Sequence, residues 1–321
     1  MLFSIKIKIQ GIIMSARAKN WPGLGLAFFM AAQTAGTALP FGNEAQASGA
    51  PDFPQWLDAC AAFTFVNGET GETLSKNADV KRSPASITKV MTAMLLFDAL
   101  EAGEISLETE MKISPRAKHT VSSGLGGYGS KITVEKAIPL LLHRSSNGAA
   151  KVIAAALVSG EPENYDVSRA EEFESMFTDK MDKRAREIGM TDTDYGSVEG
   201  FDHIRIVGKR EQLTTSSDQI LLLEYLSENY ADYLKYFRDD YGVGSTIPDE
   251  VRNKGFHGKT GTSNKAGSNL AMTHHNGNRG VVKGCSSSEQ ARSVFMAGIE
   301  RIMQGLNEPK RRPEEPELLQ N

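Results

Sequence analysis

The chain has 321 residues, and 40% of them are hydrophobic, which is enough to bury the core of one large or two modest domains. Its 36 basic and 40 acidic residues give a net charge of -4, so no strong field attracts the whole molecule to nucleic acid or anionic lipid. Composition therefore indicates a folded globular protein that does not bind nucleic acid, and its partners must be inferred from a site.

The first 47 residues have the pattern of a secretory signal peptide. A basic start precedes an apolar run over 21–40, and the small-residue pattern Ala45-Gln46-Ala47 follows, with cleavage expected after Ala47. A membrane anchor is the alternative, but Pro, Gly and Gln interrupt the run, which would make an unusually polar membrane helix. Translation from Met1 and from Met14 both stay open. We expect an exported, periplasmic protein, with association with the outer face of the inner membrane left open.

Strands are expected to open the mature chain, and a buried helix to follow them. Residues 59–74 have the pattern of two strands around Asn67-Gly68, a dipeptide that tolerates the positive φ angles of a tight hairpin. From Ile87 to Leu100, apolar residues occur at helical spacing on all sides, which predicts a helix buried on most faces. Ser83-Pro84-Ala85 marks the start of this helix.

The rest of the chain is expected to complete one domain over 48–306. Residues 133–237 have mainly helical patterns, and a last helix is predicted over 287–305. Three short strand-like runs lie between them, at 257–263, 269–275 and 279–285. Both ends of the chain therefore contribute to one antiparallel sheet. The tail, 307–321, is charged and rich in proline, so we expect it to be disordered.

A single Ser-x-x-Lys motif, from Ser86 to Lys89, lies where the buried helix begins. Alone it is better explained as a chance match or an ordinary serine N-cap. Residues three apart share one side of a helix, however, which brings the lysine nitrogen near the serine hydroxyl. Burial and the positive end of the helix dipole both disfavour a charged lysine. A neutral Lys89 could then take the proton from Ser86.

Two further short motifs occur downstream. Ser145-Ser146-Asn147 lies at a junction between helical segments, where an ordinary turn and cap is the simpler explanation. Similar patterns at Ser217 and Ser227 fall within a predicted helix or its cap and are discounted. Lys259-Thr260-Gly261 lies in a strand-like run and could be only an exposed edge strand with a glycine bulge. On a sheet edge, however, a lysine and a hydroxyl can hold a carboxylate, and a peptide can add as a strand.

The three motifs together are more informative than any one of them. They occur with gaps of 145 − 86 = 59 and 259 − 145 = 114 residues, in the order found in class A β-lactamases and penicillin-binding proteins. From about Cys60 to Gly305 the chain resembles the low-molecular-mass penicillin-binding proteins, the D-alanyl-D-alanine carboxypeptidases of peptidase family S11. The stretches that carry this resemblance are 84–114, 144–154, 181–193 and 258–271.

The resemblance implies an α/β (α+β) fold of the β-lactamase/transpeptidase type. It consists of a five-stranded antiparallel sheet flanked by helices and a mainly helical subdomain, with the site in the cleft between them. The first two motifs would supply Ser86 as the acylated nucleophile, Lys89 as its base and Ser145 as a proton relay. Asn147 would contact the substrate amide. No metal and no cofactor are expected.

The third motif would bind the end of the substrate. By resemblance, Lys259 and Thr260 bind the terminal carboxylate, while Gly261 lets the substrate backbone lie close. The backbone amides of Ser86 and Thr262 would form the oxyanion hole, and the position of Ser86 at a helix start supports its part independently.

The resemblance also bears on the two cysteines, because Cys60 and Cys285 fall on the first and last strands of the resembled fold. These strands are neighbours, so a disulfide is our hypothesis, and the pair could form in an oxidising compartment. The chain departs from the family in two places. YGSVEGF, from Tyr195, replaces an FxNxxGL-like stretch, and nothing after Leu306 resembles the C-terminal domain or anchor helix of many relatives, so membrane attachment has no support.

The expected function is that of a serine D-alanyl-D-alanine carboxypeptidase that trims peptidoglycan stem peptides through an acyl-enzyme on Ser86, with β-lactam antibiotics as covalent inhibitors. A DD-endopeptidase that cuts cross-links uses the same chemistry and stays open. A β-lactamase is less favoured, because Glu161 and Glu163 follow Asn147 too closely, the first by only 161 − 147 = 14 residues. A β-lactam sensor would need a membrane segment linked to an effector.

Overall fold

The computed structural model describes residues 4–9, 12–17, 58–202 and 211–306. The chain divides into two units, 1–52 and 53–321. In the first unit, strands β1 (Ser4–Ile9) and β2 (Ile12–Arg17) pair antiparallel. The apolar run, the cleavage site and the tail that we predicted lie outside the described residues, so the signal peptide and the disordered tail stay predictions.

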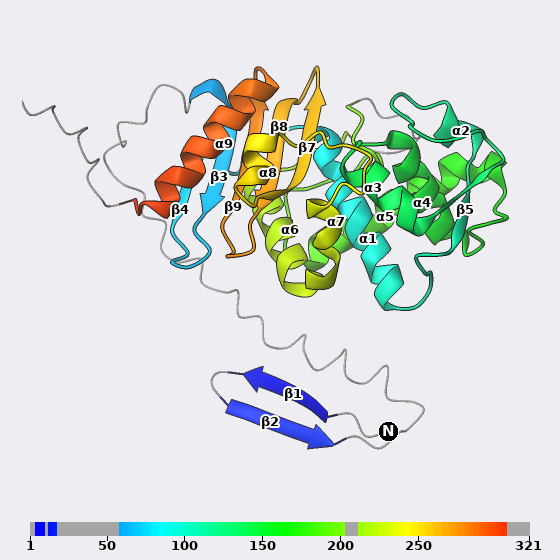
Figure 1. Cartoon of the computed structure of the whole chain (residues 1–321), viewed down its shortest axis with the longest axis horizontal. Helices are drawn as coiled ribbons and strands as arrows, with labels where there is room; N and C mark the ends of the chain where they lie inside the picture. The colour runs from blue at the N-terminus through cyan, green and yellow to red at the C-terminus, as the bar shows by residue number, and fades with distance from the viewer. Residues whose placement is uncertain (1–3, 10–11, 18–57, 203–210, 307–321) are drawn as a thin grey trace, which may run out of the picture. The chain divides into compact units, whose positions relative to one another are not determined.

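The second unit contains the expected five-stranded antiparallel sheet, in the order β4-β3-β9-β8-β7 (Figure 1). Strand β3 from the start of the unit pairs with β9 near its end, with Ala62 opposite Lys283. Segments from the beginning and the end of the second unit therefore build one sheet, as predicted for the mature chain. The strands are β3 (Ala62–Val66), β4 (Thr73–Lys76), β7 (His257–Ser263), β8 (Gly267–Thr273) and β9 (Arg279–Cys285).

The hairpin between β3 and β4 forms where predicted, but its turn is wider than predicted. Six residues, 67–72, connect the strands, and the Asn67 side chain accepts the backbone N–H groups of Glu69 and Thr70. Gly71 adopts the left-handed conformation, with φ of +74°. Gly68 is needed for a different reason, since a Cβ there would lie 2.2 Å from the Gly277 carbonyl carbon.

Alternate residues of the central strands face two separate apolar layers. Leu270 and Val282 pack with helix α9 (Ser288–Met303), whereas Ala271 and Val281 face the larger core that includes α6 (Ser216–Asn229). The sheet is thus covered by helices on both sides, which confirms the predicted fold class.

A mainly helical region fills residues 134–238, as predicted. Within it, the helical pattern over 216–237 is divided between two helices: α6 ends at Asn229, and a short helix at 235–238 follows a 3₁₀ turn at 231–233. The main helices of this region and of the nucleophile segment are α1 (Lys89–Glu101), α3 (Val134–Leu142), α4 (Asn147–Ser159) and α5 (Ala170–Glu187). The short elements are α2 (Pro115–Lys118), α7 (Lys235–Arg238), α8 (Asp249–Asn253), β5 (Glu110–Lys112) and β6 (Lys131–Thr133).

Cys60 and Cys285 form a disulfide, and their Cα atoms are 4.0 Å apart. Cys60 lies just before β3 and Cys285 ends β9, so the pairing of these two strands brings the cysteines together. The bond joins residues 225 positions apart, and the hypothesis of a disulfide is confirmed.

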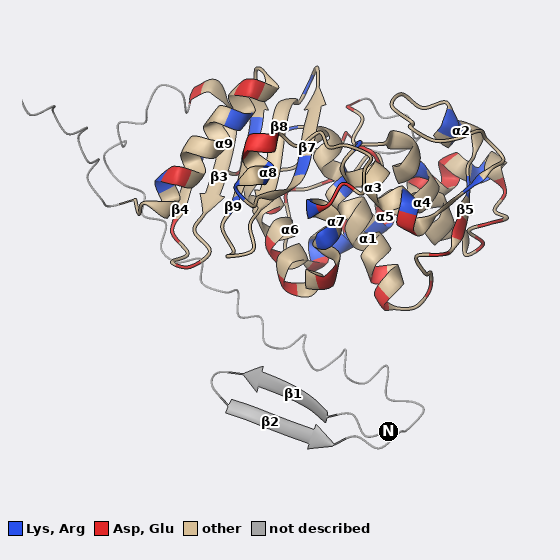
Figure 2. Cartoon of the chain, in the orientation of Figure 1, with Lys and Arg blue, Asp and Glu red and all other residues tan. Residues whose placement is uncertain are grey.

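Basic and acidic residues are interspersed along the helices and loops of the second unit (Figure 2). This distribution agrees with the small net charge. In the described part of the chain, no helix combines the length and the apolar character that a bilayer crossing requires.

Candidate active site

Ser86 lies in a 3₁₀ turn, η2 (Ala85–Thr88), that leads directly into α1. Ala85 has a φ of +48°, a left-handed conformation that is strained for a residue with a Cβ. Two glycines lie in close contact with the backbone of this turn. A Cβ at Gly200 would lie 2.0 Å from the Ala85 carbonyl oxygen, and one at Gly261 would lie 3.1 Å from the Ser86 nitrogen. The surrounding packing therefore holds the strained turn and the serine in place.

The Lys89 side chain is completely buried and makes three hydrogen bonds. Its Nζ lies 2.9 Å from the Ser86 Oγ, 2.7 Å from the Asn147 Oδ1 and 2.6 Å from the Glu199 carbonyl oxygen. As a neutral amine, Lys89 can donate two of these bonds and accept the third from the Ser86 hydroxyl. The expected closeness of Ser86 and Lys89 is thus observed, with two additional partners from distant parts of the chain.

Burial lowers the pKa of Lys89 from its ordinary value to about 7. The Glu199 carboxylate opposes this effect by favouring the protonated lysine, whereas the positive charge of Lys151 reinforces it. A large fraction of Lys89 is therefore neutral near pH 7, as a general base requires.

The three residues of the second motif make different contacts in the structure. Ser146, not Ser145, is the N-cap of α4, and its hydroxyl accepts the Ala149 N–H. Asn147 accepts from Lys89 and donates its amide N–H to the Val121 carbonyl at 2.7 Å. Ser145 has a φ of +54°. Within the described residues its hydroxyl makes no hydrogen bond to Ser86 or Lys89, so its relay role stays a prediction.

The third motif lies on β7, an outer strand of the described sheet. Lys259 and Gly261 face the turn η2 that carries Ser86, called the nucleophile turn below, because residues two apart share one face of a strand. Lys259 is completely buried and donates to the Thr260 carbonyl at 2.8 Å, and burial together with the Lys89 charge holds its pKa well below its ordinary value. Thr260 faces the other way, with its hydroxyl 2.8 Å from that of Thr246.

The residues of the third motif differ in their exposure to solvent, and therefore in how easily a substrate can reach them. Thr262 is exposed, and Thr260 is partly exposed. Lys259 and Thr260 leave the strand on opposite faces, so one carboxylate can approach both only along the outer edge of β7. The three motifs therefore lie around one turn in the structure. The Lys259 side chain, however, is not exposed to solvent.

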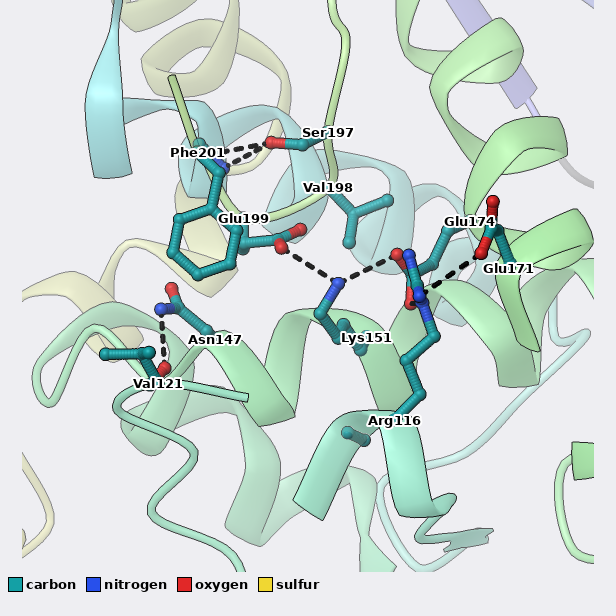
Figure 3. A network of polar contacts seen from close by, with 12 residues as sticks. Arg116, Val121, Asn147, Lys151, Glu171, Glu174, Ser197, Val198, Glu199 and Phe201 are labelled. Carbon is teal, nitrogen blue, oxygen red and sulfur yellow. Dashed lines mark hydrogen bonds and ion pairs between the residues drawn. The ribbon is translucent and has the colours of Figure 1, made fainter. Parts of the chain in front are cut away.

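Sequence reasoning missed a buried network of charged side chains around Lys151 (Figure 3). Glu199 belongs to this network, and its backbone carbonyl binds Lys89. Lys151 of α4 lies between Glu174 of α5 and Glu199, with its Nζ 2.8 Å from an oxygen of each carboxylate. Arg116 binds the other oxygen of Glu174, also at 2.8 Å. A signal was present, since Lys151 is the one charged residue in the otherwise apolar stretch GAAKVIAAALV.

The loop with the unusual sequence YGSVEGF is part of the site. It supplies the Glu199 carbonyl that binds Lys89 and the Gly200 backbone that contacts Ala85. Sequence comparison with the family marked this loop as divergent, but only the fold shows what it touches.

The two glutamates considered for a β-lactamase lie away from the site. Glu161 follows Gly160, the C-cap of α4, at the end opposite Asn147, and this helix of 13 residues is about 20 Å long. Glu163 pairs with Lys131 on the surface. In the described residues, no group of three or more His, Cys, Asp or Glu side chains is arranged to hold a metal ion. The expectation of no metal stays a prediction.

The sequence profile of the peptidase S11 family, described as D-alanyl-D-alanine carboxypeptidase, matches residues 54–284. The D-alanyl-D-alanine carboxypeptidase DacF of Bacillus subtilis is 25% identical over 183 residues, which cover 55% of this chain and 42% of that protein. DacC of Escherichia coli is 25% identical over 237 residues, covering 69% and 54%. The chain thus spans about half the length of these two relatives. The D-alanyl-D-alanine endopeptidase of E. coli is 27% identical over 248 residues, covering 73% and 74%.

Solved structures show the same fold. D-alanyl-D-alanine carboxypeptidase DacD from Francisella tularensis superposes with a TM-score of 0.62 at 23% identity, covering 77% of this chain and 70% of that chain. Penicillin-Binding Protein D2 from Listeria monocytogenes, in its ampicillin-bound form, gives 0.58 at 22% identity, covering 76% and 97%.

Proposed function

The chain belongs to the peptidase S11 family of D-alanyl-D-alanine carboxypeptidases, and on that premise we propose that it hydrolyses the terminal D-alanyl-D-alanine bond of peptidoglycan stem peptides. The observation that carries the proposal is the contact between Ser86 and a buried lysine whose pKa is about 7, next to an outer strand. A serine needs such a base to become a nucleophile near neutral pH.

Acylation begins when neutral Lys89 takes the proton of the Ser86 hydroxyl. The Oγ then attacks the carbonyl carbon of the penultimate D-alanine, and the N–H groups of Ser86 and Thr262 stabilise the oxyanion. The carbon–nitrogen bond breaks, and Ser145 passes the proton from Lys89 to the departing D-alanine amine. Water next attacks the ester on Ser86, with Lys89 again accepting the proton. The bond between the acyl carbon and the Ser86 Oγ then breaks, the shortened peptide leaves with a new carboxyl group, and Lys89 returns the proton to the Oγ.

The outer edge of β7 is the proposed binding strand for the peptide. Its backbone groups directed away from β8 can pair with an extended substrate. Gly261 lets β7 lie close to the turn that carries Ser86, so that the bound peptide comes close to the nucleophile, and Thr260 contacts the terminal carboxylate with its hydroxyl. Lys259 lies below the edge, where the approach of the substrate carboxylate favours its protonated, positively charged form, while Asn147 contacts the substrate amide.

β-Lactam antibiotics are proposed to acylate Ser86 in the same way. Support comes from the solved relative from L. monocytogenes, which has been determined in ampicillin-bound and cefotaxime-bound forms. We further propose that residues 1–47 direct export, that residues 48–306 form the catalytic domain and that the protein acts in the periplasm. The Cys60–Cys285 disulfide supports an oxidising compartment.

A second candidate is a DD-endopeptidase that cuts peptide cross-links through the same acyl-enzyme. It is favoured by the endopeptidases of E. coli and Pseudomonas aeruginosa, which are 27% and 28% identical to this chain. The chain spans 74% and 66% of their lengths, more than of DacF or DacC.

One experiment tests both candidates. The purified protein is incubated with pentapeptide muropeptide monomers and with cross-linked dimers, and the products are identified by mass spectrometry. A carboxypeptidase releases D-alanine from the monomers, whereas an endopeptidase converts dimers to monomers. If neither substrate changes while a Ser86→Ala variant behaves identically, the proposed hydrolase function is wrong.

A further inference from the structure

Four charged side chains form a buried group beside the base. Lys151, Glu174 and Glu199 are each more than nine-tenths buried, and Arg116 is half-buried at the outer end of the group. Buried charges are tolerated only when they are paired. Lys151 meets this condition by binding both carboxylates at once, as Figure 3 shows.

Glu199 connects this group to Lys89 in two ways. Its backbone carbonyl accepts a hydrogen bond from the Lys89 Nζ, while its carboxylate is held by Lys151. The next residue, Gly200, packs against the carbonyl of Ala85 in the nucleophile turn. A change in the position of Glu199 therefore reaches both the base and the turn that carries the nucleophile.

The charges of the buried group balance without a proton on Lys89. Arg116 and Lys151 contribute two positive charges, and Glu174 and Glu199 contribute two negative charges. Glu171, which also contacts Arg116, is exposed enough for water to screen it. On the β7 side, the Lys89 charge lowers the pKa of Lys259, so two positive charges at these positions disfavour each other. A protonated Lys89 would therefore add a positive charge that no further carboxylate of the buried group neutralises.

We propose that Lys151 and Glu199 are a pair of positioning residues that hold Lys89 against Ser86 and together set how much of it is in the neutral form that acylation requires. The proposal rests on the acyl-enzyme function proposed above. Neither residue touches the substrate, and both act through Lys89. Because their charges are opposite, they must shift the protonation of Lys89 in opposite directions.

The variants Lys151→Met and Glu199→Gln separate this role from simple structural support. Without the Lys151 charge, the Glu199 carboxylate faces Lys89 unopposed and stabilises its protonated form. Without the Glu199 charge, Lys151 acts alone and stabilises the neutral form. The double variant removes one charge of each sign, so its effects on Lys89 are expected to cancel and its buried group stays balanced.

The first measurement is the rate constant for acylation by fluorescent penicillin from pH 5 to 10. We expect the midpoint of the acidic limb to move up by about one pH unit in Lys151→Met and down by about one unit in Glu199→Gln. Lys151→Arg should have the same pH profile of acylation as the parent, because it keeps the positive charge. The matched control is Lys183→Met, which removes a lysine charge from the exposed surface of α5 and should leave the profile unchanged.

The second measurement does not depend on activity. The Lys89 side chain is titrated by NMR through its Cε carbon, assigned by its loss in a Lys89→Arg variant. Opposite shifts in the two single variants support the proposal even if no penicillin binds, in which case the proposed function alone fails. Equal or same-direction shifts overturn the proposal, whatever the acylation rates. If Lys151→Met does not fold, Glu199→Gln decides, since an unchanged or upward midpoint contradicts the proposal.

Discussion

The Nζ of Lys89 lies 2.9 Å from the Oγ of Ser86, within hydrogen-bonding distance. Because Lys89 is buried, this contact joins a hydroxyl to an amine that loses its proton readily. We predict that Ser86→Ala abolishes covalent labelling by fluorescent penicillin, since the nucleophile is gone. Lys89→Arg should slow labelling by about a hundredfold or more, because a guanidinium cannot accept the proton.

Gel fluorescence and intact-protein mass measure the labelling, and circular dichroism checks that both variants keep the parent fold. Labelling that persists in Ser86→Ala would identify a different nucleophile.

The rate of acylation should depend on pH through Lys89. Its pKa is lowered to about 7, so raising the pH through this value removes the proton and activates the base. We expect the rate to rise to a plateau above pH 8 and to be about a hundredfold lower at pH 5, two units below the pKa. Stopped-flow measurement of penicillin acylation gives the profile. A midpoint above pH 9 would show that Lys89 titrates as an ordinary exposed lysine.

Gly200 should tolerate no side chain. It has a φ of +101°, and a Cβ would lie 2.0 Å from the Ala85 carbonyl oxygen. Gly200→Ala must therefore displace the nucleophile turn, and we expect labelling of Ser86 to fall by about a hundredfold or more. The matched control is Gly103→Ala, at a φ of +69° with no atom within 4 Å of the added Cβ.

The control variant also places a side chain at a positive φ, at a backbone cost of about 1 kcal/mol, but has no contact with the turn, so its labelling should equal that of the parent. Equal losses in the two variants would show that backbone strain alone, and not contact with the nucleophile turn, explains the effect.

The Cys60–Cys285 disulfide should stabilise the fold substantially, because it joins positions 225 residues apart and restricts the unfolded chain. In Cys60→Ala/Cys285→Ala, we expect the free energy of unfolding to fall by about 2–5 kcal/mol. Urea denaturation measures the difference. The parent, unfolded and refolded with a reductant, serves as the control and should match the variant. An unchanged midpoint in the variant would contradict this role.

Release of the penicilloyl group should be much slower than acylation. The expelled β-lactam nitrogen stays tethered and obstructs water, and the nearby Glu199 carboxylate is held by Lys151. Without a dedicated base for water, we expect hydrolysis of the adduct to be about a hundredfold slower than turnover of a D-alanyl-D-alanine peptide. Intact-protein mass spectrometry follows the adduct over time. Rapid loss of the adduct, with catalytic destruction of penicillin and no release of D-alanine, would indicate a β-lactamase instead.

Local patterns in the sequence were sufficient to predict most elements of the fold. The two-residue period of the strand runs and the helical period after Ile87 depend only on which residues share a face, and that information is local. For the same reason the closeness of Ser86 and Lys89, three positions apart, could be predicted. The neighbouring positions of Cys60 and Cys285 required the resembled fold, since no local pattern relates residues so distant.

The tertiary structure alone decided which distant groups surround the base. Asn147 is 58 positions from Lys89 and Glu199 is 110 positions away, and only the packing of α4 and the 195–201 loop onto α1 brings them together. The burial of Lys151 between two carboxylates was equally hidden, because the cost of burying a charge depends on partners that other segments supply. A sequence motif specifies the reacting groups, whereas their protonation depends on the charges that the fold packs around them.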